Sequence, residues 1–321
     1  MDRTRRTVLE WIAAGALGGG AAGALAQPAP AYLRSTQPLR LVQGFPPGGA
    51  VDRVARVLAP ELARDLGRPV IGEHLPGANG IRAIRAVAES TSDADVLLFA
   101  TSAIANRSDP NVADSRVDTL RPVIMTSTTP MVLVVRASLG IDDVVSFAER
   151  LKRGPALSYG SSGVGNGTHI APADLVKRIA GLAVHVPYQG GPPMLNDLVG
   201  GHIDFAMLGV SATLAQLPTL RLLAVSTAKR TRLPRFDGLP TIAETILPEY
   251  DISLWQALLA PPMFSQASIL DLNRRLNDIL ALERVRIALA DAGAEPVGGS
   301  PDTAAALIRA EVERFARIVG R

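Results

Sequence analysis

The chain has 321 residues, 47% of them hydrophobic and 20% charged, so it can bury one large core or two cores of ordinary size and is not intrinsically disordered. The formal net charge is only +3, aromatic residues make up 4%, and no basic run is interleaved with them, which speaks against nucleic-acid binding. The absence of cysteine excludes disulfides, thiolate nucleophiles, cysteine-ligated metals and a lipid-modified cysteine after a signal peptide.

The first 26 residues have the pattern of an export signal. Arg5 and Arg6 stand just before an apolar stretch from Trp11 to Ala26, and Ala24-Leu25-Ala26 offers a small-x-small cleavage site. The paired arginines resemble a Tat signal, and an ordinary Sec signal is the alternative. The apolar stretch is shorter than the roughly 20 residues that a membrane span needs. We therefore expect a cleaved signal peptide at 1–26 and an exported, periplasmic mature protein.

A first series of alternating strands and helices follows the signal. Apolar runs predict strands at Leu39–Phe45, Arg68–Glu73 and Asp95–Thr101. The last of these is almost entirely apolar, as expected for a strand that is covered on both faces. Helical spacing of apolar residues predicts helices at Val51–Leu66 and Gly80–Ser90.

A long extended segment, Arg121–Arg136, then leads to a second series, and we expect a break in it near Ser127–Pro130. Strands are predicted at Ala156–Tyr159, Val184–Tyr188, Ile203–Leu208, Leu220–Ser226 and Trp255–Ala260. Helices are predicted at Ile170–Ile179, Pro193–Val199, Ser268–Ala292 and Pro301–Val319.

Two such series joined by an extended crossover predict an α/β protein with two parallel-sheet lobes rather than one sheet. We assign residues 38–129 and 251–321 to lobe 1 and residues 130–250 to lobe 2. In such proteins ligands bind at the carboxyl ends of the strands, where loops meet helix amino ends. We therefore expect the ligand-binding residues in the strand-to-helix loops.

The first of these loops is Phe45-Pro46-Pro47-Gly48-Gly49-Ala50-Val51-Asp52. Gly48 and Gly49 allow the backbone to turn tightly and to approach a ligand closely. The free N–H groups at the start of the next helix then favour an anion. Asp52 is expected to cap the helix or to accept from an amine on the ligand. A capped turn that binds no ligand is the alternative.

The second loop runs from Tyr159 to His169 and opens the helix at Ile170. Its composition of hydroxyls, an amide and unhindered backbone N–H groups favours binding of an oxyanion at a helix amino end. His169 is a further donor candidate, although a lone histidine at a helix start is as often a cap. The candidate ligand contacts here are Ser161, Ser162, Gly163, Asn166, Thr168 and His169.

Enzyme and metal motifs fail when they are tested position by position. Val164 stands where Gly-x-Ser-x-Gly needs its last glycine, and Thr168 stands where Gly-x-Gly-x-x-Gly needs its third. No P-loop and no His-Glu-x-x-His motif is present, and the four histidines lack metal-type spacing. The sequence shows no base placed beside a nucleophile, so we expect no catalytic residues, no metal and no cofactor.

Other polar residues at strand ends are weaker candidates for contact with a ligand. The hydroxyl of Tyr188 follows a strand, although a core tyrosine with a satisfied hydroxyl is more common. Asp204 opens a strand, where a lone carboxylate is usually a cap or turn acceptor. The remaining candidates are Asn79, Ser102 and Thr128.

These motifs together resemble the Bug family, the extracytoplasmic solute receptors of tripartite tricarboxylate transporters. The resemblance rests on Phe-Pro-Pro-Gly-Gly-x-x-Asp at 45–52, Pro-Gly-Ala-Asn-Gly at 76–80, Tyr-Gly-Ser-Ser-Gly at 159–163 and Pro-Tyr-x-Gly-Gly with Asp-Leu-x-Gly-Gly-x-x-Asp at 187–204. Leu-Pro-Thr-Ile-Ala-Glu at 239–244 and Trp-Gln-Ala-Leu-Leu-Ala-Pro at 255–261 extend it. The likeness runs in order from about 39 to 319.

The resemblance implies a type II periplasmic-binding-protein fold with a hinge, near 127–130 and 248–256, and an interlobe cleft that closes on a small carboxylate. The two glycine-rich loops would grip the carboxylate. Ala50 departs from the Ser or Thr that the family commonly has after the paired glycines. The implied partners are the carboxylate and the integral membrane subunits of the transporter, and we expect a monomer. A signalling receptor and, less well supported, an exported enzyme acting on small carboxylic acids are the alternatives.

Overall fold

The computed structural model describes residues 31–92, 94–107, 109–210 and 219–319. The predicted signal peptide at 1–26 lies outside the described residues. In the part of the chain that is described, no helix combines the length and the apolar character needed to cross a membrane.

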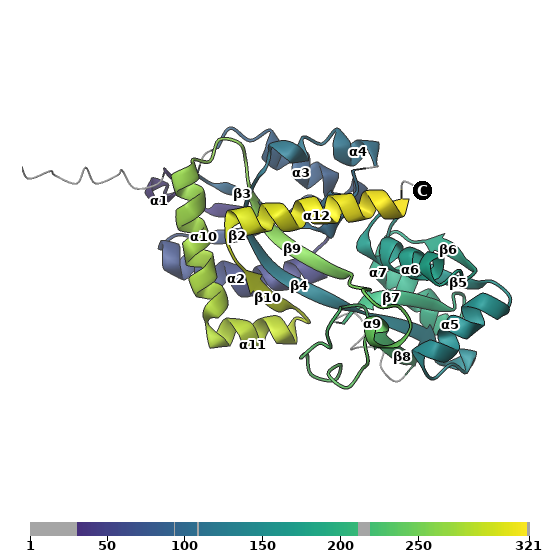
Figure 1. Cartoon of the computed structure of the whole chain (residues 1–321). Coiled ribbons are helices and arrows are strands. Elements are labelled where there is room, and N and C mark those ends of the chain that lie inside the picture. Colours follow the sequence, from purple (N-terminus) through teal and green to yellow (C-terminus); the bar gives the residue numbers. More distant parts are fainter. Residues whose placement is uncertain (1–30, 93, 108, 211–218, 320–321) are drawn as a thin grey trace, which may run out of the picture.

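The strands lie centrally and the helices cover them (Figure 1). The strands are β1 Leu39–Gln43, β2 Val70–His74, β3 Val96–Thr101, β4 Arg121–Arg136, β5 Leu157–Ser161, β6 Ala183–Pro187, β7 Phe205–Gly209, β8 Leu220–Val225, β9 Ser253–Ala260 and β10 Glu295–Gly298. The α-helices are α1 Ala31–Arg34, α2 Ala50–Leu66, α3 Ile81–Ala88, α4 Pro110–Ala113, α5 Val144–Arg153, α6 Gly167–Arg178, α7 Gly191–Gly200, α9 Ile242–Thr245, α10 Gln266–Ala281, α11 Glu283–Asp291 and α12 Pro301–Val319. Short 3₁₀ helices are η1 Ala78–Gly80, η2 Ser102–Ala105, η3 Val117–Thr119 and η4 Ala137–Leu139.

The hydrogen-bonded strands follow the order β2-β1-β3-β9-β4-β7-β5-β6, with β8 and β10 also paired to β4. The pairs β1–β2 and β1–β3 are parallel, and so are β5–β6 and β5–β7. The long strands β4 and β9 join antiparallel to their neighbours. The predicted α/β architecture is confirmed, but both sheets are mixed rather than purely parallel.

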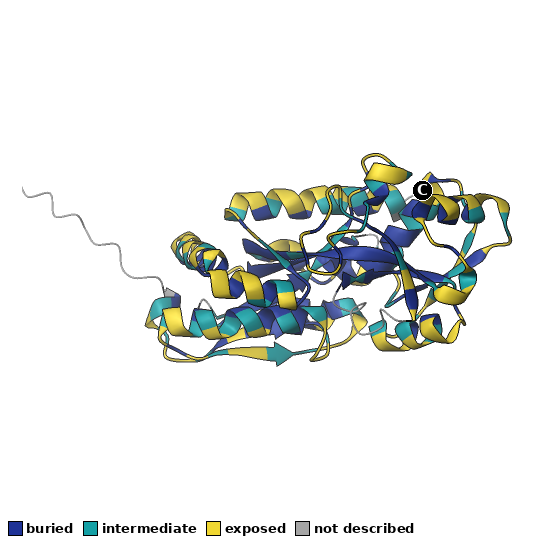
Figure 2. Cartoon of the chain, turned by 90° about the horizontal axis from the view of Figure 1, so that it is seen from below, coloured by how far each residue is buried: buried dark blue, intermediate teal, exposed yellow. Residues whose placement is uncertain are grey.

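The strands form two sheets that share β4: the first also contains β1, β2, β3, β9 and β10, and the second also contains β5, β6, β7 and β8. The central strands of each sheet are buried on both faces, as Figure 2 shows, whereas the edge strands β2 and β6 are partly exposed. In the first sheet, α2, α10 and α11 pack on one face, and α3 and α12 pack on the other. In the second sheet, α5 and α6 cover one face and α7 covers the other. Phe315 of α12 shares a cluster with Ile170 of α6, so α12 joins the first sheet to a helix that covers the second.

Two predicted elements differ from the observed ones in their continuity. The segment Arg121–Arg136 is one unbroken strand, because Pro130 lies where β4 leaves β9 and joins β7, a position at which its missing N–H disturbs neither ladder. The helix predicted at Ser268–Ala292 is two helices, because Leu282 takes an extended backbone (φ −64°, ψ 129°) while it packs on the core. No Gly or Pro marks this break.

Candidate ligand-binding site

The loop at 44–49 links β1 to α2, and Asp52 in the first helical turn holds it in place. The Asp52 carboxylate is 3% exposed. Its Oδ2 accepts from the Gly48 N–H and from Arg56 Nε, both at 2.8 Å, and its Oδ1 lies 3.0 Å from His74 Nε2. Burial acts to raise the pKa of this carboxyl, but the hydrogen bonds outweigh burial and hold the pKa below its ordinary value. Asp52 therefore stays ionised and shapes the loop.

The amino end of α2 carries no side-chain cap, because its N-cap residue is Gly49. Gly48 has a φ of +82°, a left-handed conformation that favours glycine. Arg53 Nη1 donates to the Gly48 carbonyl at 3.2 Å and brings a positive charge to the loop. We did not single out Arg53 from the sequence, although its position in the first turn after the paired glycines was a signal. The helix dipole, the uncapped amides and Arg53 together suit an anion.

In the loop between β5 and α6, by contrast, most polar groups bond to one another. Asn166 Oδ1 caps α6 by accepting from the N–H groups of Thr168 at 3.1 Å and His169 at 3.3 Å. The Ser162 N–H donates to Thr168 Oγ1 at 2.9 Å, and Ser162 Oγ accepts from Asn166 Nδ2 at 3.2 Å. A ligand that contacts these groups must compete with bonds that the loop already makes.

The structure brings Ser161 against His185, a pairing that we did not foresee from the sequence. Ser161 is wholly buried, and its Oγ lies 2.7 Å from His185 Nε2 and donates to the Gly163 carbonyl at 3.1 Å. The rings of His185 and His169 stack with centroids 4.0 Å apart. Burial lowers the pKa of His169, and burial followed by the neighbouring His169 lowers that of His185 to about 4. Both imidazoles are therefore neutral at pH 7.

The position of the serine proton decides what this contact does. When Ser161 gives its one hydroxyl proton to the Gly163 carbonyl, the neutral His185 donates its Nε2 proton to the serine oxygen. A general base would instead have to accept the serine proton. The pair thus stabilises the start of the loop.

The loops of the two lobes meet at residues 79–80. Asn79 Nδ2 donates to the Val164 carbonyl at 3.0 Å, and a Cβ built on Gly163 would lie 2.9 Å from Asn79 Oδ1. A Cβ on Gly44, at the start of the lobe 1 loop, would lie 2.3 Å from Gly80 Cα. The two glycine-rich loops therefore face a common segment rather than separate surfaces.

Two more polar residues of lobe 1 line this contact. A Cβ on Gly167 would lie 3.6 Å from Ser102 Oγ. Ser102, which directly follows β3, therefore lies next to the loop of lobe 2. A Cβ on Gly165 would lie 2.1 Å from Asn106 Nδ2. Sequence reasoning missed Asn106, since nothing in its local pattern distinguishes it from an ordinary loop residue.

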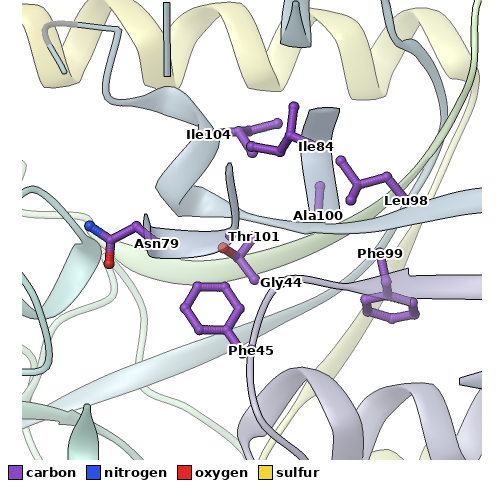
Figure 3. Close-up of a pocket in the computed structure, with 10 residues that line it drawn as sticks. Gly44, Phe45, Asn79, Ile84, Leu98, Phe99, Ala100, Thr101 and Ile104 are labelled. Carbon is purple, nitrogen blue, oxygen red and sulfur yellow. The ribbon is translucent and has the colours of Figure 1, made fainter. Parts of the chain in front are cut away.

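A small hollow lies at the carboxyl edge of β1 and β3 (Figure 3). Polar groups come from Asn79 and Thr101, while Phe45 lies beside them. The apolar side chains of the lining come from Ile84, Leu98, Phe99, Ala100 and Ile104.

The side chains of three predicted contacts bond to, or pair with, other parts of the protein. Asp204 binds Arg136 Nε at 2.9 Å and the Ser158 N–H at 2.8 Å at the amino ends of β5 and β7, the opposite edge from Ser161. The Tyr188 hydroxyl donates to Asp197 at 2.7 Å and so ties its loop to α7. Thr128 is half-buried within β4, where it pairs with Trp255 of β9. Of the three, Tyr188 borders the loop of lobe 2, because its backbone N–H donates to the Ser161 carbonyl at 2.9 Å.

Within the described ranges, no group of three or more His, Asp or Glu side chains is placed to hold a metal ion.

Comparison with known proteins gives consistent matches over most of the chain. The pattern of the tripartite tricarboxylate transporter family receptor matches residues 54–321. The chain is 31% identical over 305 residues to Protein BugT of Bordetella pertussis, and the alignment covers 93% of each protein. It is similar to the structure of R. palustris Rpa4515 with adipate, with a TM-score of 0.80 and 29% identity over 89% of this chain and 98% of that one.

A second solved structure, MatC from Rhodopseudomonas palustris with bound malate, has a TM-score of 0.74 and 26% identity over 88% of this chain and 98% of that one. These matches confirm both the type II periplasmic-binding-protein fold and the resemblance that the motifs indicated. The chain therefore belongs to the tripartite tricarboxylate transporter family receptors.

Proposed function

We propose that this protein is an exported periplasmic receptor that binds a small carboxylate between its two lobes. It would present the carboxylate to the integral membrane subunits of a tripartite tricarboxylate-type transporter. The observation that carries the proposal is the uncapped amino end of α2, with Arg53 beside it. The loop that leads into α2 begins at Gly44, which contacts Gly80, and the neighbouring Asn79 contacts the loop of lobe 2. The relatives solved with adipate and with malate support the choice of ligand class.

In this proposal the backbone N–H groups that follow Gly48 and Gly49, at the start of α2, replace part of the water around the carboxylate group of the ligand. The Ser162 hydroxyl and the amide of Gly163 complete the contact from lobe 2. Lobe 1 comprises residues 38–129 and 251–321, and lobe 2 comprises residues 130–250. The hinge lies at 127–130 and 248–256, where β4 and β9 run side by side. Closure is stabilised by those contacts that the open form lacks.

The protein acts as a receptor and not as a catalyst in this proposal. Ser161, the buried serine beside a histidine, has its proton committed to a backbone carbonyl, and Asp52 has both oxygens committed to protein donors. Neither group is free to transfer a proton to a bound acid. Transport is favoured over signalling by the family to which the chain belongs.

A thermal-shift experiment tests the ligand class. Adipate or malate in excess should raise the melting temperature, because a ligand that binds only the native form stabilises it by about 2.7 kcal/mol at 100 times its Kd. The shift should disappear in Gly49→Leu, which places a bulky side chain at the amino end of α2, and should shrink in Ser162→Ala.

The matched control is Gly238→Ala, because a Cβ at Gly238 meets no atom within 4 Å. This variant should keep the full ligand-induced shift. If carboxylates leave the melting temperature unchanged while only neutral sugars or cations raise it, the proposed ligand class is wrong.

A further inference from the structure

The segment that carries Asn79 has an unusual backbone. Four consecutive residues have left-handed φ values, +134° at Gly77, +47° at Ala78, +53° at Asn79 and +92° at Gly80. Ala78 and Asn79 have a Cβ that clashes in this region, although asparagine tolerates it better than most residues. Strained backbone of this kind persists only where the surroundings hold it.

The strained backbone aims the Asn79 side chain across the interface between the lobes. Its Nδ2 donates to the Val164 carbonyl at 3.0 Å, a contact between residues 85 positions apart. The loop of lobe 2 leaves room for this side chain only because residue 163 is glycine, since a Cβ there would lie 2.9 Å from Asn79 Oδ1. Gly163 itself has a φ of +154°. The hydrogen bond exists only while the two loops are in contact.

The same segment also touches the proposed ligand loop. Gly80, the neighbour of Asn79, lies so close to Gly44 that a Cβ there would come within 2.3 Å of Gly80 Cα. Phe45 Cε2 lies 3.6 Å from the position of a Cβ on Gly80. A shift of the loop at 44–49 must therefore move the backbone that presents Asn79.

We infer that Asn79 is a positioning residue that latches the closed form: its side-chain amide holds the lobe 2 loop against lobe 1 and thereby sets the population of closed protein. This role differs from that of a direct ligand contact. Its effect on affinity rests on the proposed function, whereas its effect on the distance between the lobes does not.

The distance between the lobes tests the latch without any ligand. Because the chain contains no cysteine, spin labels can be attached to single cysteines introduced at exposed Arg85 in α3 and exposed Glu149 in α5. Double electron–electron resonance then reports the distribution of interlobe distances. In Asn79→Gly, which keeps the left-handed backbone and removes the amide, the ratio of closed to open protein should fall by about twofold to tenfold, as loss of one neutral hydrogen bond predicts.

Two further variants make the result decisive. Ala78→Gly relieves the adjacent left-handed residue without removing the hydrogen bond, so its distance distribution should match that of the parent. Asn79→Asp keeps the size of the side chain but, ionised at neutral pH, turns an acceptor toward the Val164 carbonyl, and should open the lobes at least as far as Asn79→Gly. If Asn79→Gly leaves the distribution unchanged, or if Ala78→Gly opens the lobes equally, Asn79 is not a latch.

Titration with adipate and malate by calorimetry adds the affinity. The apparent Kd should rise in Asn79→Gly in proportion to the fall in the closed fraction that the distance measurement gives, because only the closed form binds tightly. If the lobes open in Asn79→Gly while its Kd stays equal to that of the parent, the latch does not control affinity. If neither acid binds the parent protein, the proposed ligand class fails, and the distance measurement still decides the latch.

Discussion

His169 and His185 lie stacked beneath the loop of lobe 2, and each has a neutral ring bonded to that loop. His169 Nδ1 accepts from the Gly165 N–H at 3.0 Å, and His185 bonds to Ser161. Protonation of His169 removes its acceptor, and protonation of both rings places two like charges about 4 Å apart. The shape of the loop is therefore coupled to pH through two residues that need not touch the ligand.

The stability of the protein should depend on pH through His185. Its pKa of about 4 in the folded protein lies below the ordinary value of 6.5, so the unfolded chain binds the proton more readily. Stability is then highest above pH 6.5 and falls as the pH drops toward 4. In urea titrations, the parent protein should lose more stability between pH 7 and pH 5 than His185→Asn does. Parallel losses in the two proteins would show that His185 does not titrate in this way.

The loops after β1 and β2 meet backbone to backbone, and this contact depends on a residue without a side chain. Gly44 approaches Gly80 more closely than any Cβ permits. The close approach joins the loop that leads into α2 to the segment that carries Asn79. The position of one loop thus determines that of the other.

Gly44→Ala should therefore be markedly destabilising. The added methyl group meets backbone atoms, which cannot rotate away, and overpacking of this kind costs about 1–3 kcal/mol. Gly238→Ala is the matched control and should stay within about 0.5 kcal/mol of the parent, since a Cβ there meets nothing. Equilibrium unfolding in urea measures both. Equal stability of the two variants would mean that the Gly44–Gly80 contact relaxes without cost.

At the scale of the whole molecule, the two lobes share structure. The strand β4 pairs with β9 and β10 in one sheet and with β7 and β8 in the other, and its residues from Val123 to Ser127 and from Thr129 to Val135 are buried. In addition, α12 packs against the first sheet and against α6, which covers the second. Unfolding of one lobe removes partners from a strand that the other lobe needs.

We therefore expect urea to unfold both lobes in one cooperative transition. Trp255, which pairs with Thr128 where β9 runs along β4, reports locally by fluorescence, and far-UV circular dichroism reports on the whole chain. In mature protein that lacks residues 1–26, Trp255 is the only tryptophan, so its signal is unambiguous. The two transition midpoints should coincide. Separate midpoints would show that the shared strand does not couple the lobes.

Local pattern in the sequence was sufficient for the order and type of most elements and for the family. The paired glycines at 48–49 and the glycine-rich run at 160–167 locate the two loops, because tight turns and close approach restrict the residues allowed there. The helix Pro301–Val319 was predicted to the residue, since Pro at the start of an apolar-periodic run marks a helix amino end. The strands β5 and β7 differ from their predictions by no more than two residues at each end.

Tertiary structure alone decided which polar groups are bonded within the protein, which can contact a ligand, and which lie close together. The sequence allowed for Asp52, Tyr188 and Asp204 to be bonded within the protein. It did not identify their partners His74, Asp197 and Arg136, which folding brings to them. The contact of Asn79 with Val164 joins residues 85 positions apart, and the break at Leu282 follows from packing on the core. Sequence periodicity reports only neighbours along the chain, whereas hydrogen bonding and packing depend on residues that folding brings together.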